Sequence, residues 1–581
     1  MFGQNAIGDL RARLHWNWNM TDVQENGPEP RRRKSRLRGP RRRWIAIAVV
    51  VIAVAAGVYA AISTGRSGGT AATPVHHGTL HFGVAGTQVS LDPAGSSTDV
   101  THLIDRNIFD SLVAQTGPDT FSPWLATGWT VSPDGRTYRF TLREGVTFHD
   151  GTPFDATAVV ATFDHILDPK TKSTSSSSLL AAYQETRIVD THTVDVVLKQ
   201  PFRPFLSALS TTGLGIQSPK ALAAGEADYR PVGTGPFRFD RNDPGHSEIL
   251  VRYDGYDSPP TGAAHTGPAY LDRLQFDFIG EDSTRVGALT SGELHGINGV
   301  PPVSANSLQG RSGLALHDVE SPGLTYSLYL NQTHGPLRDP AVRRALAAAI
   351  DVRKLVGSIY FGRYPVADSP ISRATADYDP TAGSELPTYD PAAAKHLLDQ
   401  AGWNQVDSDG YRVKNGARLS LVWPNWIDGQ RDQRTVVADG IRAQAKDVGI
   451  EIQRPDAETG TYIERYLSGG DYDIVDGNSV SPTPDVLRFA FFSTNTFAHS
   501  GSNMALVNSP QIDGWLTDAD VTTDAGRAAA DYASVQHEVL KQTFVVPIYS
   551  AVASYGVSTS IRGVTWDAQT YPRFYDTWLA N

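Results

Sequence analysis

A strand–helix–strand pattern between residues 418 and 453 constrains the fold most. Residues 418–423, RLSLVW, alternate apolar and polar side chains as a half-buried strand does. Apolar residues then recur at helical spacing over 437–448, Gly449 suits the end of that helix, and residues 450–452 begin a second strand. Two strands joined through one helix usually lie parallel in one sheet. The pattern therefore predicts an α/β fold with parallel strands.

Other segments have equally clear local patterns. Residues 129–142 are typical of a hairpin, because a Ser-Pro-Asp-Gly turn separates two alternating stretches. Residues 340–350 and 390–402 carry apolar stripes at helical spacing, and Asp390 can cap the second helix. A short strand is expected at 472–475. The mixture supports α/β layers, whose ligand sites tend to form at the carboxyl ends of strands.

Composition excludes several kinds of function. The chain has 581 residues, of which 40% are hydrophobic and 19% charged, so several folding units with sizeable cores are expected. A net charge of −11 argues against a nucleic-acid-binding surface. The absence of cysteine from the sequence excludes disulfides, thiolate metal sites, iron–sulfur clusters, cysteine nucleophiles and a lipid-modified N-terminal cysteine.

The N-terminal region predicts a membrane anchor. Residues 44–63 contain no charge, and at about 1.5 Å per residue they span roughly 30 Å of hydrocarbon. Arginine and lysine gather just before this run, within residues 31–43, so the N-terminus is expected in the cytoplasm. The alternative is a cleaved signal peptide ending near Ala60 or Ala61. Residues 64–78 are rich in Gly, Ser and Thr and read as a linker, with the folded part beginning near Thr79.

Several long motifs of the folded part carry a family resemblance. Residues 121–168 include LATGW, SPDGRTYRF and LREGVTFHDGTPF followed by a predicted helix. Further matching segments follow in order: GTGPFRF at 233–239, LTSGELHGI at 289–297, LYLNQTHGPLRDPAVRRALAAAID at 328–351, YDPAAAKHLLDQAGW at 389–403, GDYDIV at 470–475 and VVPIYS at 545–550. Over roughly residues 79–578 the chain resembles the bacterial family 5 solute-binding proteins, the peptide-, dipeptide-, oligopeptide- and nickel-binding components of ABC importers.

The resemblance implies a type II periplasmic-binding-protein fold of cluster C, with two α/β lobes and an extra subdomain in the first. The expected organisation is a cytoplasmic disordered basic segment at 1–43, a transmembrane signal anchor at 44–63, a linker at 64–78, lobe 1 at 79–106 and 215–320 with the inserted subdomain at 107–214, lobe 2 at 321–548, and a C-terminal return to lobe 1 at 549–581.

The function implied by the resemblance is solute capture without catalysis. A peptide-like or other small polar solute would bind between the lobes, and closure would present the protein to the permease subunits, with the ATPase subunits engaged indirectly. No cofactor and no nucleic-acid partner are expected. The binding part would lie outside the cytoplasmic membrane, periplasmic or on the outer face, held by a single span. A tethered ligand sensor and an extracellular hydrolase are the alternatives, although the sequence has no G-x-S-x-G, H-E-x-x-H or phosphate-loop motif.

The resemblance also suggests where the solute touches. The loop after the first strand and the segment after the strand at 418–423 are expected at the cleft. In peptide-binding relatives an aspartate four residues before a proline pairs with the free amino group of the peptide, but here Val480 stands four residues before Pro484. This departure argues against free-peptide recognition. A charge could come from Asp476 or Asp485 instead, or neutral hydrogen bonds from nearby side chains could bind a modified peptide, a sugar or another small polar solute. The candidate substrate-binding residues are Thr87, Gln88, Trp423, Trp426, Asn478, Ser479, Ser481 and Asp485.

Three histidines raise the question of a metal, because nickel is a ligand of the family. His76 and His77 fall in the linker, where rigid coordination geometry is not expected, and His81 follows shortly after. No metal site is predicted from them.

Overall fold

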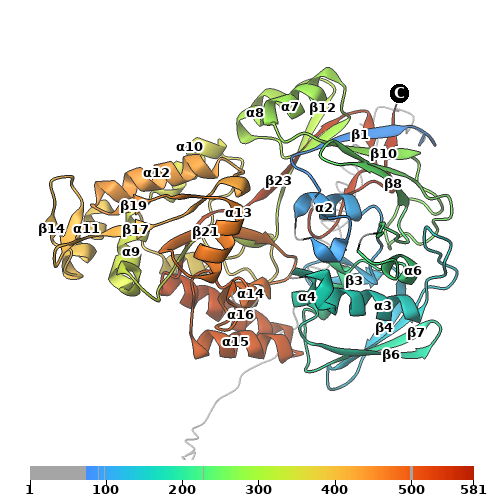
Figure 1. The fold of residues 1–581 in the computed structure, drawn as a ribbon, viewed down its shortest axis with the longest axis horizontal. Coiled ribbons are helices and arrows are strands. Elements are labelled where there is room, and N and C mark those ends of the chain that lie inside the picture. Colours follow the sequence, from blue (N-terminus) through green and yellow to red (C-terminus); the bar gives the residue numbers. More distant parts are fainter. Residues whose placement is uncertain are drawn as a thin grey trace, which may run out of the picture. The chain divides into compact units, whose positions relative to one another are not determined.

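The computed structural model describes residues 74–580, apart from residues 89, 97, 174, 227 and 498–500 (Figure 1). The expected cytoplasmic segment, the expected transmembrane anchor and residues 64–73 of the linker lie outside the described residues. Within the part that is described, no helix has both the length and the apolar character needed to cross a bilayer.

The first region is built on a mixed sheet of seven strands within the described chain. Its central strand, β1 (Thr79–Val84), pairs in parallel with β10 and with β11. Leu80, Phe82 and Val84 of β1 are buried in the core of this region. The order of the sheet is β12 (Leu314–Glu320), β23 (Val552–Ser558), β11 (Gly296–Asn298), β1, β10 (Arg273–Phe278), β9 (Ser247–Arg252) and β8 (Phe237–Asp243). The helices of this region include α2 (Asp99–Asp105), α7 (Asp282–Ser291) and α8 (Pro302–Leu308).

A separate four-stranded antiparallel sheet follows in the sequence and confirms the predicted hairpin. Strands β4 (Ala126–Val131) and β5 (Thr137–Leu142) pair around the Ser-Pro-Asp-Gly turn, with β7 (Thr193–Leu198) and β6 (Tyr183–Asp190) completing the sheet. Tyr138, Phe140 and Leu142 alternate onto one face and join one core with helix α3 (Ala156–Leu167). Period-two alternation is what a sheet covered on one face requires.

The second region has a three-stranded sheet whose central strand is buried on both faces. All eight residues of β13 (Gly323–Leu330) are buried between β21 (Ile474–Val480) and β22 (Val545–Tyr549). Leu328 and Leu330 join a core with α9 (Pro340–Ala349), α10 (Val352–Tyr360) and α12 (Arg434–Asp447). Tyr329 faces the other way, into a core with α14 (Val486–Phe491), α15 (Pro510–Val521) and α16 (Ala525–Lys541), which Figure 1 shows on the opposite side of β21.

The local predictions for this region are confirmed, although two strands differ from the predicted length, and the one expected at 418–423 covers only residues 420–422. Strands β17 (Ser420–Val422) and β19 (Glu451–Gln453) pair in parallel and flank α12. Helix α11 (Pro391–Gln400) begins after Asp390, whose carboxylate accepts the Ala392 and Ala393 amides at 2.9 Å. The strand expected at 472–475 instead runs from Ile474 to Val480, because the polar residues after 475 pair with β13.

We call the two regions lobe 1 (residues 74–320 and 552–580) and lobe 2 (residues 323–549). Two short segments of the chain, which we call the crossings, pass from one lobe to the other. One crossing lies between β12 and β13, and the other between β22 and β23. The amide of Ser321 donates to the carbonyl of Ala551 at 2.9 Å, so the crossings are hydrogen-bonded to each other. Paired crossings of this kind can act as a hinge, since few residues must change conformation when the lobes move.

Shorter elements complete the described fold. They include β2 (Val113–Gly117), β3 (Thr120–Pro123), α4 (Ser175–Leu179), α5 (Phe205–Ser210), α6 (Pro219–Leu222), β14 (Gln405–Val406), β15 (Arg412–Lys414), β16 (Ala417–Arg418), β18 (Asn425–Trp426), β20 (Asp456–Ala457), α13 (Thr459–Thr461), β24 (Ile561–Arg562), β25 (Thr565–Trp566), β26 (Pro572–Arg573) and β27 (Trp578–Leu579).

Candidate functional site

A cavity of about 390 Å³ lies between the two lobes. Lobe 1 lines it with residues 114–118, Thr261, residues 566–568 and Arg573. Lobe 2 contributes Ala374 and Pro482, and Pro322 comes from the crossing between β12 and β13. Sites for small molecules commonly measure about 300–1,000 Å³, so the cavity has the size of a small solute.

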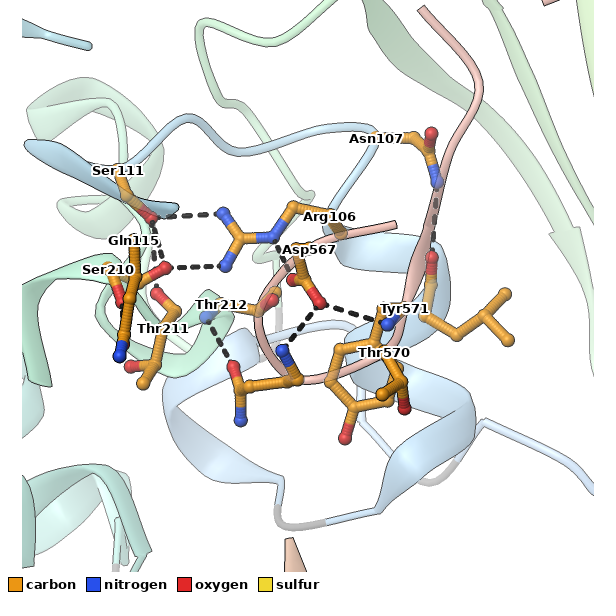
Figure 2. A network of polar contacts seen from close by, with 12 residues as sticks. Arg106, Asn107, Ser111, Gln115, Ser210, Thr211, Thr212, Asp567, Thr570 and Tyr571 are labelled. Atoms are coloured by element: carbon orange, nitrogen blue, oxygen red, sulfur yellow. Dashed lines mark hydrogen bonds and ion pairs between the residues drawn. The ribbon is translucent and has the colours of Figure 1, made fainter. Parts of the chain in front are cut away.

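A buried ion pair between Arg106 and Asp567 fixes the lobe 1 wall of the cavity (Figure 2). The Arg106 guanidinium donates from Nε to Asp567 at 2.9 Å, from Nη1 to Ser111 Oγ at 3.0 Å and from Nη2 to the carbonyl of Ser210 at 2.8 Å. Burial lowers the pKa of Arg106, and the Asp567 carboxylate opposes that effect. The loop after Trp566 is thereby fastened to the end of α2.

Asp567 is fully engaged within lobe 1. Besides Arg106, its carboxylate accepts the backbone amides of Gln569 and Tyr571, each at 2.9 Å. Gln569 in turn accepts the amide of Thr212 at 3.4 Å. These contacts, visible in Figure 2, give the loop a defined shape at the cavity.

Polar contacts cross from one lobe to the other, and one of them lies at the cavity. Gln115 Nε2 of lobe 1 lies 3.5 Å from the carbonyl of Pro482 in lobe 2. The Arg203 amide donates to the Asp520 carbonyl at 2.8 Å, and Arg203 Nη1 lies 3.6 Å from Asp377 Oδ2. These contacts hold the lobes against each other in this conformation.

Another interlobe contact involves exposed side chains. Arg431 of lobe 2 pairs with Asp99 of lobe 1 at 3.3 Å, where both side chains are about half exposed. Asp99 also accepts the hydroxyl of Tyr571 at 3.1 Å, which connects this ion pair to the loop that lines the cavity.

Lobe 2 contains a buried cluster of aromatic and charged side chains around Asp476 on β21. The two oxygens of Asp476 accept Trp423 Nε1 at 2.6 Å and the Tyr326 hydroxyl at 2.8 Å. Burial, together with the Asp476 carboxylate, raises the pKa of Tyr326 well above its ordinary value, so this hydroxyl remains a donor. Arg434 lies over the Tyr326 ring at 4.6 Å and Arg454 over Trp423 at 4.3 Å, which places two cations against aromatic faces.

The sequence-derived tryptophans have different surroundings. Trp423 is fully buried in the lobe 2 core, with its indole nitrogen bonded to Asp476. Trp426 is 36% exposed, stacks on Tyr462 with ring centroids 5.4 Å apart, and donates to Thr459 at 2.9 Å. Neither side chain lines the cavity.

None of the three polar candidates on and after β21 lines the cavity. Asn478 Oδ1 accepts Arg434 Nη2 at 2.5 Å. Ser479 pairs with Leu324 of β13 through the backbone. Ser481, whose amide donates to the Pro322 carbonyl at 3.1 Å, directly precedes the lining residue Pro482.

Asp485 has partners inside lobe 2. It lies 3.3 Å from Arg488 Nε, and Arg488 also pairs with Asp520 at 2.6 Å. Burial, with the Asp520 charge adding to it, raises the pKa of Asp485 well above its ordinary value. Its carboxyl group therefore belongs to a buried cluster of two acids and one arginine.

The two candidates after the first strand are also outside the cavity lining. Thr87 is exposed, and Gln88 is partly buried. Both atoms of the Gln88 amide are buried without a hydrogen-bond partner among the described residues.

The cavity is lined by residues that sequence reasoning did not select. The lobe 1 wall uses Gln115, Trp566, Asp567 and Arg573, which belong to segments more than 440 positions apart in the numbering. No local pattern distinguishes them, because each is an ordinary loop or strand residue until the chain brings the segments together. Over the residues that the structure describes, no group of three or more histidine or acidic side chains could hold a metal ion.

Two α/β lobes, paired crossings and a cavity between the lobes define a two-lobed solute-binding protein. Residues 120–499 match the family model for the middle region of the bacterial extracellular solute-binding proteins, family 5. The chain belongs to this family of solute-binding proteins, which deliver ligands to ABC importers.

Curated relatives and solved structures agree with this assignment. The glutathione-binding protein GsiB of Pectobacterium atrosepticum is 27% identical over 511 residues, covering 86% of this chain and 90% of that protein. NikA from Brucella suis, solved in complex with Fe(III)-EDTA, superimposes with a TM-score of 0.75 at 25% identity and covers 86% of this chain and 100% of its own. The periplasmic binding protein DppA from Helicobacter pylori, solved with the peptide STSA, shares the fold with a TM-score of 0.74 at 23% identity, over 87% of this chain and 99% of its own.

Proposed function

We propose that this protein is a membrane-tethered receptor that encloses a peptide-like solute between its lobes and passes it to the permease of an ABC importer. The observation that carries the proposal is the cavity of about 390 Å³ lined by both lobes. Polar contacts across the lobes favour a closed state, which a bound solute would stabilise further by touching both walls. The relative named as glutathione-binding supports a small peptide-like solute.

We propose that the protein binds the solute without an ion pair between an aspartate and the amino group of the solute. Val480 occupies the position where peptide-binding relatives are expected to carry that acid. Asp485 is paired with Arg488, and the acidic residue that lines the cavity in the described structure, Asp567, is paired with Arg106. A modified or unusually linked peptide therefore fits better than an ordinary free peptide.

We further propose that residues 44–63 tether the receptor, with the N-terminus in the cytoplasm. The apolar run and the preceding basic residues support this orientation. A tether would raise the effective concentration of the receptor near its permease. With an N-terminal tag on the full chain, we expect the protein to resist alkaline extraction from membranes and the tag to be protected from protease in spheroplasts. Release by alkali would contradict the tether.

Binding is tested on the full chain purified in detergent, by thermal shift followed by calorimetry. The solutes are dipeptides, longer peptides, glutathione, sugars and Ni²⁺. A solute at 100 times its Kd should stabilise the folded state by about 2.7 kcal/mol, which gives a visible shift. We expect a response to a peptide-like solute. A response to sugars or Ni²⁺ alone would overturn the peptide-like assignment.

A further inference from the structure

A segment of lobe 2, residues 369–385, touches both a crossing and lobe 1, and we call it the strap. The Ser372 hydroxyl donates at 2.8 Å to a backbone carbonyl of the crossing between β12 and β13, and Ala374 lines the cavity. At Asp377 the strap reaches lobe 1, where Oδ2 of Asp377 lies 3.6 Å from Arg203 Nη1. The position of the strap therefore bears on the closure of the lobes around the cavity.

Two adjacent residues of α16 hold the strap. The side-chain amide of Gln536 donates to the carbonyl of Asp377 at 2.8 Å and accepts the amide of Asp379 at 3.0 Å. His537 lies between two carboxylates of the strap, with Nε2 3.1 Å from Asp379 Oδ2 and Nδ1 3.2 Å from Glu385 Oε1. Asp377 has a φ of +56°, a conformation that costs free energy in a residue with a side chain, so these contacts help to maintain it.

The two carboxylate contacts of His537 are both hydrogen bonds only when the ring carries two protons. An ionised carboxylate accepts hydrogen bonds but donates none, and a neutral imidazole has a single N–H. Hydrogen bonds from Thr381, followed by the contact with His537, lower the pKa of Asp379, so this carboxylate is ionised near neutral pH. When the ring loses a proton, Nε2 can accept the Thr381 hydroxyl at 3.2 Å, and His537 then keeps only its hydrogen bond to Glu385.

His537 faces the strap, whereas the other charged residues of α15 and α16 have different neighbours. Helix α16 packs against η5 (Ala382–Glu385), α15 and β22, and β22 has no charged residue. Lys541 lies one turn beyond His537 on the same helix. The remaining contacts are those of Asp513 with the Ser493 amide, Asp518 and Asp531 with Arg527, Asp520 with Arg488, Asp524 with the Gly526 amide, and Glu538 with Gln542.

Asp377 is the titratable residue of the strap that faces lobe 1. Burial raises the pKa of Asp377, with Arg203 opposing this effect and Asp119 adding to it. Protonation of Asp377 would remove its charge from Arg203 and weaken closure as pH falls. Arg373, the basic residue of the strap, pairs with Asp368. Because Asp377 and His537 would act in opposite directions, the sign of a pH response separates them.

We propose that His537 is a pH-sensitive clamp on the strap and a positioning residue for closure of the lobes. This inference rests on the proposed function, since closure is the step that encloses the solute. The protonated ring binds both carboxylates and thereby holds Asp377 against Arg203. Loss of one proton releases one of the two contacts and loosens the strap. Histidine changes charge between about pH 5 and 8, so the closed state is more populated at pH 5.5 than at pH 8.5.

The experiment measures the distance between the lobes without any solute. Because the sequence has no cysteine, spin labels can be attached through Gln184→Cys on β6 and Ala443→Cys on α12, both at exposed positions. Pulsed EPR on the full chain in detergent then gives the distance distribution from about pH 5.5 to 8.5. The labelled protein is compared with the same protein carrying His537→Gln, Glu385→Gln or the control His396→Gln, whose exposed ring is hydrogen-bonded to Gln400. Melting temperatures identify any variant that fails to fold.

From pH 8.5 to pH 5.5, we expect the ratio of closed to open molecules to rise about two- to fivefold in the labelled protein and in His396→Gln, as for a partly exposed ion pair. The ratio should not rise in His537→Gln, and it should rise less in Glu385→Gln.

Three results would overturn the clamp: a ratio that does not change with pH, a ratio that falls at acidic pH as protonation of Asp377 would require, or a rise that persists in His537→Gln. If His537→Gln does not fold, an undiminished rise in Glu385→Gln overturns it instead. These results concern closure alone and leave the proposed function standing, because solute binding is measured separately at one pH.

Discussion

The Nε atom of Arg106 lies 2.9 Å from Oδ2 of Asp567, an ion pair between residues 461 positions apart. The Arg106 side chain is 1% exposed and that of Asp567 is 11% exposed, so solvent screens the pair little. The contact ties the C-terminal return of the chain to the end of α2 and shapes the wall of the cavity. Its main consequence is the cost of removing one partner, since the other charge then stays buried and unpaired.

Asp567→Asn should therefore lower the free energy of unfolding by about 3–5 kcal/mol. Urea unfolding of the full chain in detergent measures this change. The control is Asp254→Asn, because Asp254 pairs with Arg252 at 2.8 Å but is 79% exposed, and its loss should cost less than about 1 kcal/mol. An equal loss in the free energy of unfolding for the two variants would show that burial does not increase the cost of breaking the Arg106–Asp567 pair.

Glu248 on β9 gives lobe 1 a pH-dependent stability. Burial raises the pKa of Glu248 from 4.5 to about 8. Between these values the folded state holds a proton that the unfolded state has released, so stability falls as pH rises, by on the order of 1 kcal/mol per pH unit. Below pH 4.5 this loss is absent, and above pH 8 it is complete.

Glu248→Gln should remove this part of the pH dependence. We expect the variant and the unmodified protein to have similar urea midpoints near pH 4.5, and the variant to be more stable near pH 8.5. Burial also raises the pKa of Asp110 to about 7, so some dependence will persist. Glu293→Gln, at an exposed position, is the matched control and should leave the profile unchanged. If the urea midpoint of Glu248→Gln varied with pH in parallel with that of the unmodified protein, Glu248 would not be the group responsible.

Arg203 should favour the closed arrangement of the lobes. Its Nη1 atom lies 3.6 Å from Asp377 of lobe 2, and both side chains are mostly buried. Arg203→Gln removes this ion pair, so we expect a larger radius of gyration by small-angle scattering and a two- to fivefold (about 0.4–1 kcal/mol) weaker affinity for a bound solute. Arg187→Gln, which disturbs only an exposed pair with Glu185 on β6, is the control. An unchanged radius in Arg203→Gln would count against a role in closure.

The bond from Trp423 to Asp476 should be a measurable part of lobe 2 stability. Trp423→Phe keeps most of the ring but leaves Asp476 Oδ1 without its donor at 2.6 Å, which should cost about 1–3 kcal/mol in urea unfolding. In an Asp476→Asn background the same change should cost less, and the difference measures the coupling. Trp426→Phe, which removes a more exposed bond to Thr459, should cost less than about 1 kcal/mol. If the changes in the free energy of unfolding caused by Trp423→Phe and Asp476→Asn were fully additive, the two side chains would not be energetically coupled.

Local patterns were enough to predict several elements and the family resemblance. The strand–helix–strand unit around α12, the hairpin of β4 and β5, and the cap of α11 by Asp390 are confirmed in the structure. Each depends on residues close together in the sequence, where side-chain periodicity and capping act directly. Strand β21 extends further than predicted because its polar end pairs with β13, a partner about 150 residues away in the chain.

The sequence by itself determined the α/β class, the main local elements and the absence of cysteine chemistry. Only the tertiary structure decided which side chains meet at the cavity. It placed Asp485 among buried charges, enclosed Trp423 in the core, and brought residues 114–118 against the loop that carries Trp566 and Arg573. The physical reason is that periodicity reports which face of an element is buried, whereas an ion pair or a cavity depends on the path of the whole chain.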